Sequence, residues 1–319
     1  MRSAIRFRRL AILAIAVSAG LLAADPIFLR RQVADVKPQP DDLTAGARGA
    51  SYKPLFGIGD SDADQLKFVV RYGELTVAPA GTSALVSYPA EEQLYFVEEG
   101  SGAVLYGDEK APVKKNDFLY LPVGVKHGIA NPSGAPIRVI VMGYKIPAGT
   151  KVEPTPKLML ANSDDVGLQV LGQHGPTTQF KLLMGLTSST RDKLSSAYIM
   201  DSLFIMDFAP GGTNIPHNHP MEEEIYLLLR GSGDMVAGLD SNGKEVRHPV
   251  TAGAAFFFKP RTQVGYYSNA KEGQPHDLML AVRSRVPGMS MRGPGGGGRG
   301  GPGGRGGRGG ADNPPGRQQ

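Results

Sequence analysis

The stretch Gly211-Gly-Thr-Asn-Ile-Pro-His217-Asn-His219-Pro-Met-Glu-Glu-Glu224-Ile-Tyr-Leu-Leu-Leu-Arg-Gly231 decides how the rest of the chain is interpreted. Alternate residues of an extended strand point to the same face, so His217 and His219 should share one face. Glu224 follows five residues later and opens an apolar run, which would place its carboxylate on a buried strand. Two neutral imidazoles and a carboxylate suit Fe(II), Mn(II) or Zn(II), so the stretch predicts one divalent metal ion.

The spacing of this stretch, G-x5-H-x-H-x4-E-x6-G, resembles the first signature of the cupin superfamily. All five fixed positions of that signature are present, from Gly211 to Gly231. The resemblance implies a jelly-roll β-barrel, with a metal held by His217, His219 and Glu224. It does not select a reaction, because cupins host many reactions as well as simple binding.

A second copy of the pattern lies earlier in the chain. Residues 91–102 align without gaps on residues 222–233 and are identical at both leading glutamates, the tyrosine and Gly-Ser-Gly. A repeat of this size indicates duplication of one domain, and short apolar runs between Gly, Pro and Asn are typical of all-β folds. We therefore expect an all-β bicupin, with tandem jelly-roll barrels at 66–145 and 198–286.

The remaining segments have distinct compositions. Residues 25–65 are rich in Pro, Asp, Gly and Ala, and we expect an irregular lead-in that wraps the first barrel. Residues 146–197 contain four prolines and should connect the barrels, with a strand or two such as 179–184. Residues 287–319 are a low-complexity Gly, Pro and Arg-rich tail, which cannot bury a core and should be disordered.

The N-terminus predicts export. Residues 1–24 have a basic start and an apolar, small-residue end, which is typical of a cleaved secretory signal peptide. The alternative is an uncleaved membrane anchor, although its apolar run is short for a span. We expect a periplasmic or secreted protein with no transmembrane span after cleavage. The chain has no cysteine, so any metal must be held by nitrogen and oxygen ligands.

The charge distribution argues against nucleic acid as a partner. The formal net charge is +5, but the arginines of the two ends account for more than all of it. The middle of the chain therefore carries a small net negative charge. A basic isoelectric point here describes two tails rather than a nucleic-acid-binding surface.

The first barrel has lost most of its expected ligands. The second cupin signature is recognisable there from Pro122 to Asn131 and includes His127. In the first signature the two histidine positions fall on Ser87 and Pro89, or on Val86 and Tyr88 with another gap, and the glutamate position falls on Gln93. One ligand of four remains, so we expect this barrel to be metal-free, with His127 as a structural, hydrogen-bonded residue.

The second barrel keeps the complementary set. Gly265 stands at the histidine position of its second signature, which should open space beside the metal. Three ligands remain, and Gln263 on the same expected strand could offer a fourth oxygen. Tyr226 and Tyr266 are candidates to line the pocket. Glu222 and Glu223 are interpreted as surface or supporting charges, and His174, His248 and His276 match no ligand spacing.

These observations predict an exported, metal-dependent bicupin enzyme with Fe(II) or Mn(II) favoured and Zn(II) as a further option. Its substrate would be a small organic molecule, and its chemistry dioxygenase-like, hydrolytic or isomerising. The alternative is a non-catalytic module of the periplasm or cell surface that binds a metal or a small ligand. Cupins commonly pair through their sheets, so the resemblance also allows a homodimer.

Overall fold

The computed structural model describes residues 27–153, 155, 157–172 and 174–285. The expected signal peptide and the expected disordered tail lie outside these residues. The described part contains strands, turns and short 3-10 helices, with no α-helix, and no helix in it is long and apolar enough to cross a membrane.

The strands are short and follow one another in two series. They are β1 (Phe28–Gln32), β2 (Arg48–Gly57), β3 (Val69–Thr82), β4 (Glu91–Glu99), β5 (Ser101–Tyr106), β6 (Glu109–Lys114), β7 (Asp117–Leu121), β8 (His127–Ala130), β9 (Ile137–Lys145), β10 (Met159–Asn162), β11 (Thr178–Leu186), β12 (Leu194–Ala197), β13 (Met200–Phe208), β14 (His217–Asn218), β15 (Glu222–Arg230), β16 (Ser232–Leu239), β17 (Glu245–Thr251), β18 (Ala254–Phe258), β19 (Gln263–Ser268) and β20 (Asp277–Arg285). The 3-10 helices are η1 (Asp42–Thr44), η2 (Ala63–Gln65) and η3 (Ser163–Asp165).

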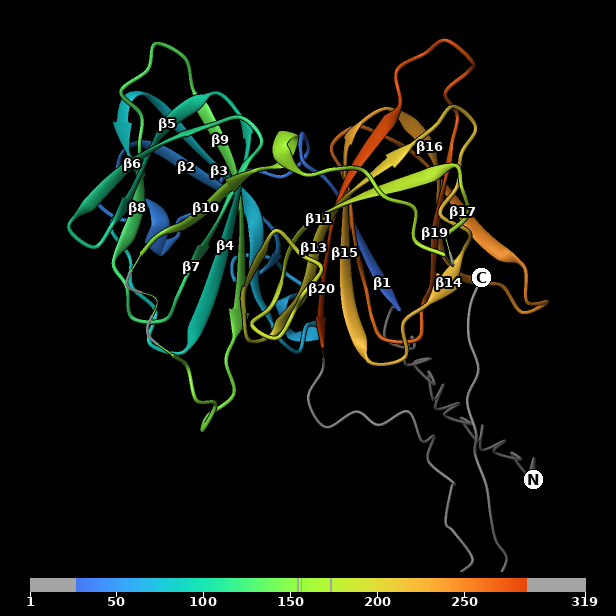
Figure 1. Cartoon of the computed structure of the whole chain (residues 1–319), viewed down its shortest axis with the longest axis horizontal. Helices are drawn as coiled ribbons and strands as arrows, with labels where there is room; N and C mark the ends of the chain where they lie inside the picture. Colours follow the sequence, from blue (N-terminus) through green and yellow to red (C-terminus); the bar gives the residue numbers. More distant parts are fainter. Residues whose placement is uncertain (1–26, 154, 156, 173, 286–319) are drawn as a thin grey trace, which may run out of the picture.

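Two β-barrels stand side by side, as Figure 1 shows. The first is built on the order β10-β7-β4-β9-β3-β8-β5-β6, with β2 paired to β3. The second has a sheet of order β1-β18-β15-β20-β13-β11-β12 and a four-stranded sheet of order β14-β19-β16-β17. The prediction of an all-β chain with two tandem jelly-roll barrels is confirmed.

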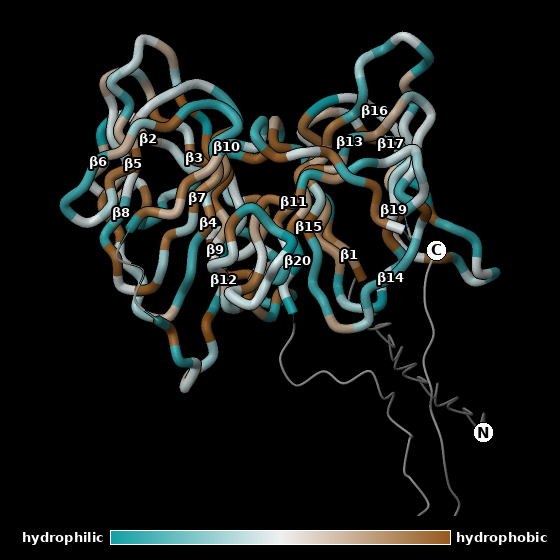
Figure 2. Tube along the Cα trace, in the orientation of Figure 1, coloured by the Kyte–Doolittle hydropathy of each residue, from teal (hydrophilic) through white to brown (hydrophobic). Residues whose placement is uncertain are grey.

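Three hydrophobic clusters hold this arrangement together. One fills the first barrel and includes Tyr95 and Val104, and a second fills the other barrel and includes Phe256. The third joins side chains of both barrels, such as Phe56 and Phe257. Figure 2 shows the corresponding hydrophobic stretches where the barrels face one another. Burial of one such side chain stabilises the fold by roughly 1.5–3 kcal/mol. Because the third cluster contains side chains of both barrels, the barrels share part of their core.

Each barrel receives a strand from the segment that precedes the other barrel. β1 lies in the second barrel, antiparallel to β18, with Phe28 opposite Phe258 and Gln32 opposite Ala254. β10 lies in the first barrel, antiparallel to β7, with Met159 opposite Tyr120. This exchange gives the chain an approximate two-fold symmetry.

The expectation of an irregular lead-in at 25–65 was therefore wrong. The segment contains β1 and the ten-residue β2, which pairs with β3 along most of its length. The five residues of β1 include the charged Arg30 and Arg31, so the sequence shows no apolar run that would indicate a strand. Arg30 lies 5.5 Å above the ring of Phe256, and Arg31 forms an ion pair with Asp60. Long arginine stems can cover apolar surface while the charge finds a partner.

The segment 146–197 also differs from a simple connector. β10 belongs to the first barrel, and β11 and β12 belong to the main sheet of the second. The expected strand at 179–184 is the middle of β11. The strands of this segment therefore complete one barrel or the other.

Two buried glutamates connect the barrels in a reciprocal way. Glu92 of β4 accepts hydrogen bonds from the backbone N–H groups of Tyr198, Ile199 and Met200, at 2.8 to 2.9 Å. Glu223 of β15 accepts them from Lys67 and Phe68, at 2.6 and 3.1 Å. Glu223, interpreted from the sequence as a surface or supporting charge, is only 1% exposed. Each carboxylate thus binds the backbone at the start of a long strand of the other barrel, β13 for Glu92 and β3 for Glu223.

Candidate functional site

The second barrel brings His217, His219 and Glu224 together. In β14 and β19, His217 is opposite Val264 and Asn218 is opposite Gln263. Strand alternation directs His217 and His219 into the barrel and Asn218 outward. Glu224 projects into the same space from β15, where it stands opposite Arg283 of β20 and is 2% exposed.

The donor atoms of these residues converge. The Nε2 atoms of His217 and His219 are 3.0 Å apart, and Nε2 of His219 is 3.5 Å from Oε2 of Glu224. Neither carboxylate oxygen of Glu224 has a hydrogen-bond partner among the described residues. A buried carboxylate without a partner is unfavourable, so this geometry suits a cation that binds between the three side chains.

Burial sets the protonation of the three groups. Desolvation lowers the pKa of His217 to about 4 and that of His219 to about 3, and the charge of Arg283 acts in the same direction. Desolvation also raises the pKa of Glu224 to about 7, against the opposing effect of Arg283. The imidazoles are therefore neutral near pH 7, which leaves lone pairs for a metal.

The hydrogen bonds define where the imidazole protons lie. Nδ1 of His217 donates to the carbonyl of Ile215 at 2.9 Å, so its Nε2 is an acceptor. Arg283 donates to Nδ1 of His219 at 3.3 Å, so the proton of His219 lies on Nε2, between the two rings. Among the described residues, no three donors are already arranged as a formed metal site.

A metal ion at this place requires a small rearrangement. The proton between the two Nε2 atoms must leave, and the neutral His219 then carries its proton on Nδ1. Arg283 could no longer donate to that nitrogen and would turn to another acceptor. With this change the nitrogen and oxygen donors are of the types that bind a divalent cation.

A small cavity of ≈20 Å³ opens onto these groups. This is room for about one water molecule or one ion, so a larger ligand would extend into the space in front of it. Arg191 and Arg283 line both this cavity and an outer depression of ≈320 Å³, so they stand at its entrance. The other lining residues are Leu171, His174, Phe180, Leu182, Ser202, Phe204, Met206 and Tyr226.

Several of these residues were not found from the sequence. Arg283 and Arg191 match no cupin signature, and His174 had been set aside because its spacing fits no ligand pattern. Arg283 did carry a signal, since it is a charged residue within the otherwise apolar and small run 278–284. Arg191 and His174 lie in segments without regular strands, where periodicity gives no information.

Gln263 and Tyr266 lie away from the site. Gln263 is opposite Asn218, faces outward and lines a separate surface depression, so the suggestion of a fourth oxygen ligand was wrong. Tyr266 is fully buried, packs on Phe208 with ring centroids 4.8 Å apart and donates a hydrogen bond to Asp277 at 2.8 Å. It is a core residue and does not line the cavity, whereas Tyr226 does.

The expected position of the missing histidine was displaced by one residue. In the first barrel His127 forms a bridge with Val86, and in the second the equivalent bridge joins Val264 to His217. Val264 therefore holds the histidine position. A Cβ atom on Gly265 would lie 2.7 Å from Cγ of Pro216, so the glycine accommodates that proline and opens no space beside a metal.

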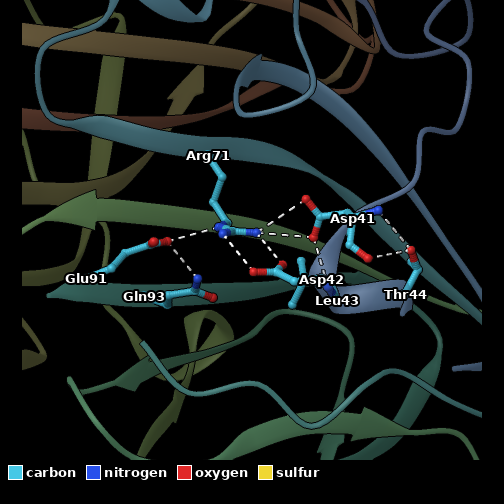
Figure 3. Close-up of polar contacts among 7 residues, drawn as sticks. All are labelled: Asp41, Asp42, Leu43, Thr44, Arg71, Glu91 and Gln93. Carbon is cyan, nitrogen blue, oxygen red and sulfur yellow. Dashed lines mark hydrogen bonds and ion pairs between the residues drawn. The ribbon is translucent and has the colours of Figure 1, made fainter. Parts of the chain in front are cut away.

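The same comparison assigns the residues at the signature positions of the first barrel. Val86 and Tyr88 hold its two histidine positions, and Gln93 holds the glutamate position. Arg71 lies near Gln93, as Figure 3 shows, and it is only 2% exposed. Its guanidinium forms ion pairs with Asp41, Asp42 and Glu91 at 3.1, 2.8 and 3.0 Å.

His127 is the remaining imidazole of the first barrel. It is 1% exposed, and its Nδ1 donates to the carbonyl of Val125 at 2.9 Å. Burial lowers its pKa to about 4. The centre of this barrel thus contains a neutral histidine and an arginine cation that is already surrounded by carboxylates.

Comparison with known proteins gives a consistent result. The cupin domain family model matches twice, at residues 73–143 and 204–279. The chain is 30% identical over 152 residues to germin-like protein subfamily 2 member 1 of Arabidopsis thaliana, which covers 46% of this chain and 67% of that protein. It is 36% identical over 87 residues to subfamily 2 member 4 of the same plant, and 34% identical over 86 residues to oxalate oxidase 1 of Hordeum vulgare. These last two matches cover 27% and 26% of the chain and only 39% and 42% of the relatives.

Solved structures share the fold at low identity. A protein of Pseudomonas aeruginosa described as glyoxylate-induced superposes with a TM-score of 0.64 at 17% identity, over 83% of this chain and 92% of that one. The oxalate decarboxylase of Lactobacillus farciminis, solved with formate, gives 0.59 at 14% identity, over 81% and 86%. Both comparisons cover the two barrels together.

Proposed function

The chain belongs to the cupin family, and we propose that it is an exported, metal-dependent bicupin enzyme that acts on a small carboxylic acid. The metal would be Fe(II) or Mn(II), held in the second barrel by His217, His219 and Glu224. Zn(II) also suits these ligands. Export is proposed from the basic start and apolar run of residues 1–24.

One observation carries this proposal. The three converging donors open onto the same small cavity as Arg283 and Arg191. A metal alone would suit many substrates, but two arginines beside it favour an anion. The planar guanidinium group matches a carboxylate and can bind it through two parallel hydrogen bonds.

The roles follow from the positions of the side chains. When bound, the metal supplies a Lewis acid with positions left for substrate or oxidant, which favours dioxygenase-like or oxidase-like chemistry first. Arg283 would exchange its contact with His219 for the substrate carboxylate. Phe204 and Tyr226 form walls that limit the access of water. Arg191, which donates a hydrogen bond to the hydroxyl of Ser202 at 3.0 Å, would line the entrance of the cavity together with Arg283.

The choice of carboxylic acid has further support from the relatives. Those compared include proteins named oxalate oxidase and oxalate decarboxylase. Oxalate is therefore the first substrate to test, followed by other short mono- and dicarboxylates. The small volume of the cavity favours acids of this size over sugars or polymers.

The test is turnover by the metal-loaded protein. Product formation and O2 consumption are measured with oxalate and related acids, for the wild type and for Arg283→Gln. We expect Arg283→Gln to lower kcat/KM by roughly 10- to 100-fold, as for the loss of a hydrogen bond to a charged group, while the metal content is kept.

Arg247→Gln is the matched control, since Arg247 pairs with Glu245 at the surface and lies outside the cavity. It should leave kcat/KM unchanged. If the loaded protein turns over no acid but still binds one, the protein is a binding module. If Arg283→Gln is as active as the wild type, the assignment of the arginine is wrong.

A further inference from the structure

The strands of the second barrel offer three metal donors and no fourth. Val264, at the place of the usual fourth ligand, is 2% exposed and packs in the apolar core of the barrel. Gly265 faces the other way, against Pro216. A further protein ligand must therefore come from outside the barrel strands.

His174 lies at the mouth of the second barrel. The chain on either side of it is held by two backbone hydrogen bonds between Gln169 and Phe180, of 3.0 and 2.8 Å. Gln169 lies before β11, and Phe180 lies in it. The ring of His174 packs on Phe180 with centroids 4.9 Å apart, and it lines the cavity that contains His217. Its Nδ1 donates to the carbonyl of Asn214 at 3.2 Å, so the lone pair is on Nε2.

The distances between the rings agree with a shared ion. For metal–nitrogen bonds of about 2.1 Å, two imidazoles that bind at nearly right angles have ring centroids roughly 4.5–5 Å apart. The ring centroids of His217 and His219 are 4.8 Å apart, and those of His174 and His217 are 4.7 Å apart. The ring of His174 therefore lies about as far from the ring of His217 as the ring of His219 does.

The first barrel provides an independent parallel. There the bridge of Gln39 with Tyr52 matches that of Gln169 with Phe180. The segment behind that bridge carries Asp41 and Asp42 to the cation of Arg71. In both halves, the segment that precedes β2 or β11 brings polar side chains to the centre of the barrel.

We propose that His174 is the fourth protein ligand of the metal in the second barrel, in place of the histidine that the barrel strands lack. The inference rests on the proposed metal site. It makes the ligand set three imidazoles and one carboxylate. It also gives the segment between the barrels a direct part in the centre, since that segment would be fixed by the metal.

The experiment uses the full-length protein and two probe ions. Co(II) titration gives an affinity, and pulsed electron paramagnetic resonance of the Cu(II)-loaded protein counts coordinated imidazoles. His174→Phe keeps a ring against Phe180 and removes the nitrogen. We expect it to bind Co(II) about 10-fold more weakly or worse and to show two coupled imidazoles instead of three.

The controls separate the possible outcomes. His276→Ala removes an imidazole that pairs with Asp207 at the surface, and it should change neither result. His174→Gln serves as a second variant if the phenylalanine disturbs folding, and the imidazole count should fall in the same way. A loaded His174→Phe protein with unchanged affinity and three imidazoles would overturn the assignment of His174 alone. A wild type that takes up no Co(II) would overturn the metal site and the ligand with it.

Discussion

At the scale of single residues, the two barrels differ in where their central positive charge comes from. In the first barrel Arg71 brings a permanent cation, and three carboxylates surround it. In the second barrel the oxygens of Glu224 have no such partner among the described residues, and Arg283 stays 4.0 Å away. A buried charge needs a counter-charge, so the first barrel is complete in itself and the second suits an added ion.

His127 should make the stability of the protein depend on pH. Its pKa is about 4 when folded, because it is buried, and about 6.5 when unfolded. The unfolded chain therefore binds more protons between these values, so the free energy of unfolding falls as the pH drops from about 6.5 to about 4. The contribution of this group is on the order of 3 kcal/mol.

The measurement is urea denaturation of the wild type and of His127→Gln at pH 7.5 and pH 4. The other ionisable groups are the same in both proteins, so the comparison isolates His127. We expect the variant to lose less stability on acidification than the wild type. Equal losses would show that His127 is not held neutral in the folded protein.

At the scale of the elements, the contacts of Glu92 and Glu223 fix how the barrels meet. Each receives backbone N–H groups from the opposite barrel. Glu92→Gln and Glu223→Gln replace an acceptor oxygen by an amide, which would face those donors. We expect each change to lower the free energy of unfolding by roughly 1–3 kcal/mol, with the larger effect at Glu92, which accepts more bonds.

Chemical denaturation of the two variants tests this expectation. Glu222→Gln is the control, because Glu222 neighbours Glu223 but accepts its hydrogen bond from the adjacent backbone N–H of Met221 rather than from the other barrel. Its effect should stay within about 0.5 kcal/mol. If Glu92→Gln is as mild as the control, these carboxylates do not hold the barrels together.

Sequence patterns predicted the elements unevenly. The repeat of residues 91–102 in 222–233 was enough for two barrels, because it lies on nine-residue strands that are mostly buried and keep the same residues at matching positions. The exchange of β1 and β10 was not predicted, since strands of four or five residues carry little periodicity. The one-residue error between Val264 and Gly265 has a similar origin: strand register depends on pairing with β14 and β16, which the sequence does not specify.

The site was predictable only as far as its signature. Strand alternation placed His217 and His219 on one face, and the resemblance to the cupin signature added Glu224. Arg283 and His174 reach the same cavity from distant segments. Their contribution depends on the folded arrangement of β20 and of the turn before β11, so spacing along the chain could not reveal it.

At the scale of the whole molecule, the chain is an approximate two-fold duplication whose halves have diverged in chemistry. The halves exchange strands, share a hydrophobic cluster and bind each other's backbone through glutamates. One half has an internal arginine cation, and the other has converging metal donors. We therefore expect one divalent ion per chain rather than two or none.

Metal analysis of the full-length protein, produced without a histidine tag, tests this expectation most directly. We predict about one Fe or Mn ion per chain in the wild type and in His127→Gln, and little or none in His217→Ala and Glu224→Gln. A wild type without metal, a second ion per chain, or loss of the metal in His127→Gln would contradict the account.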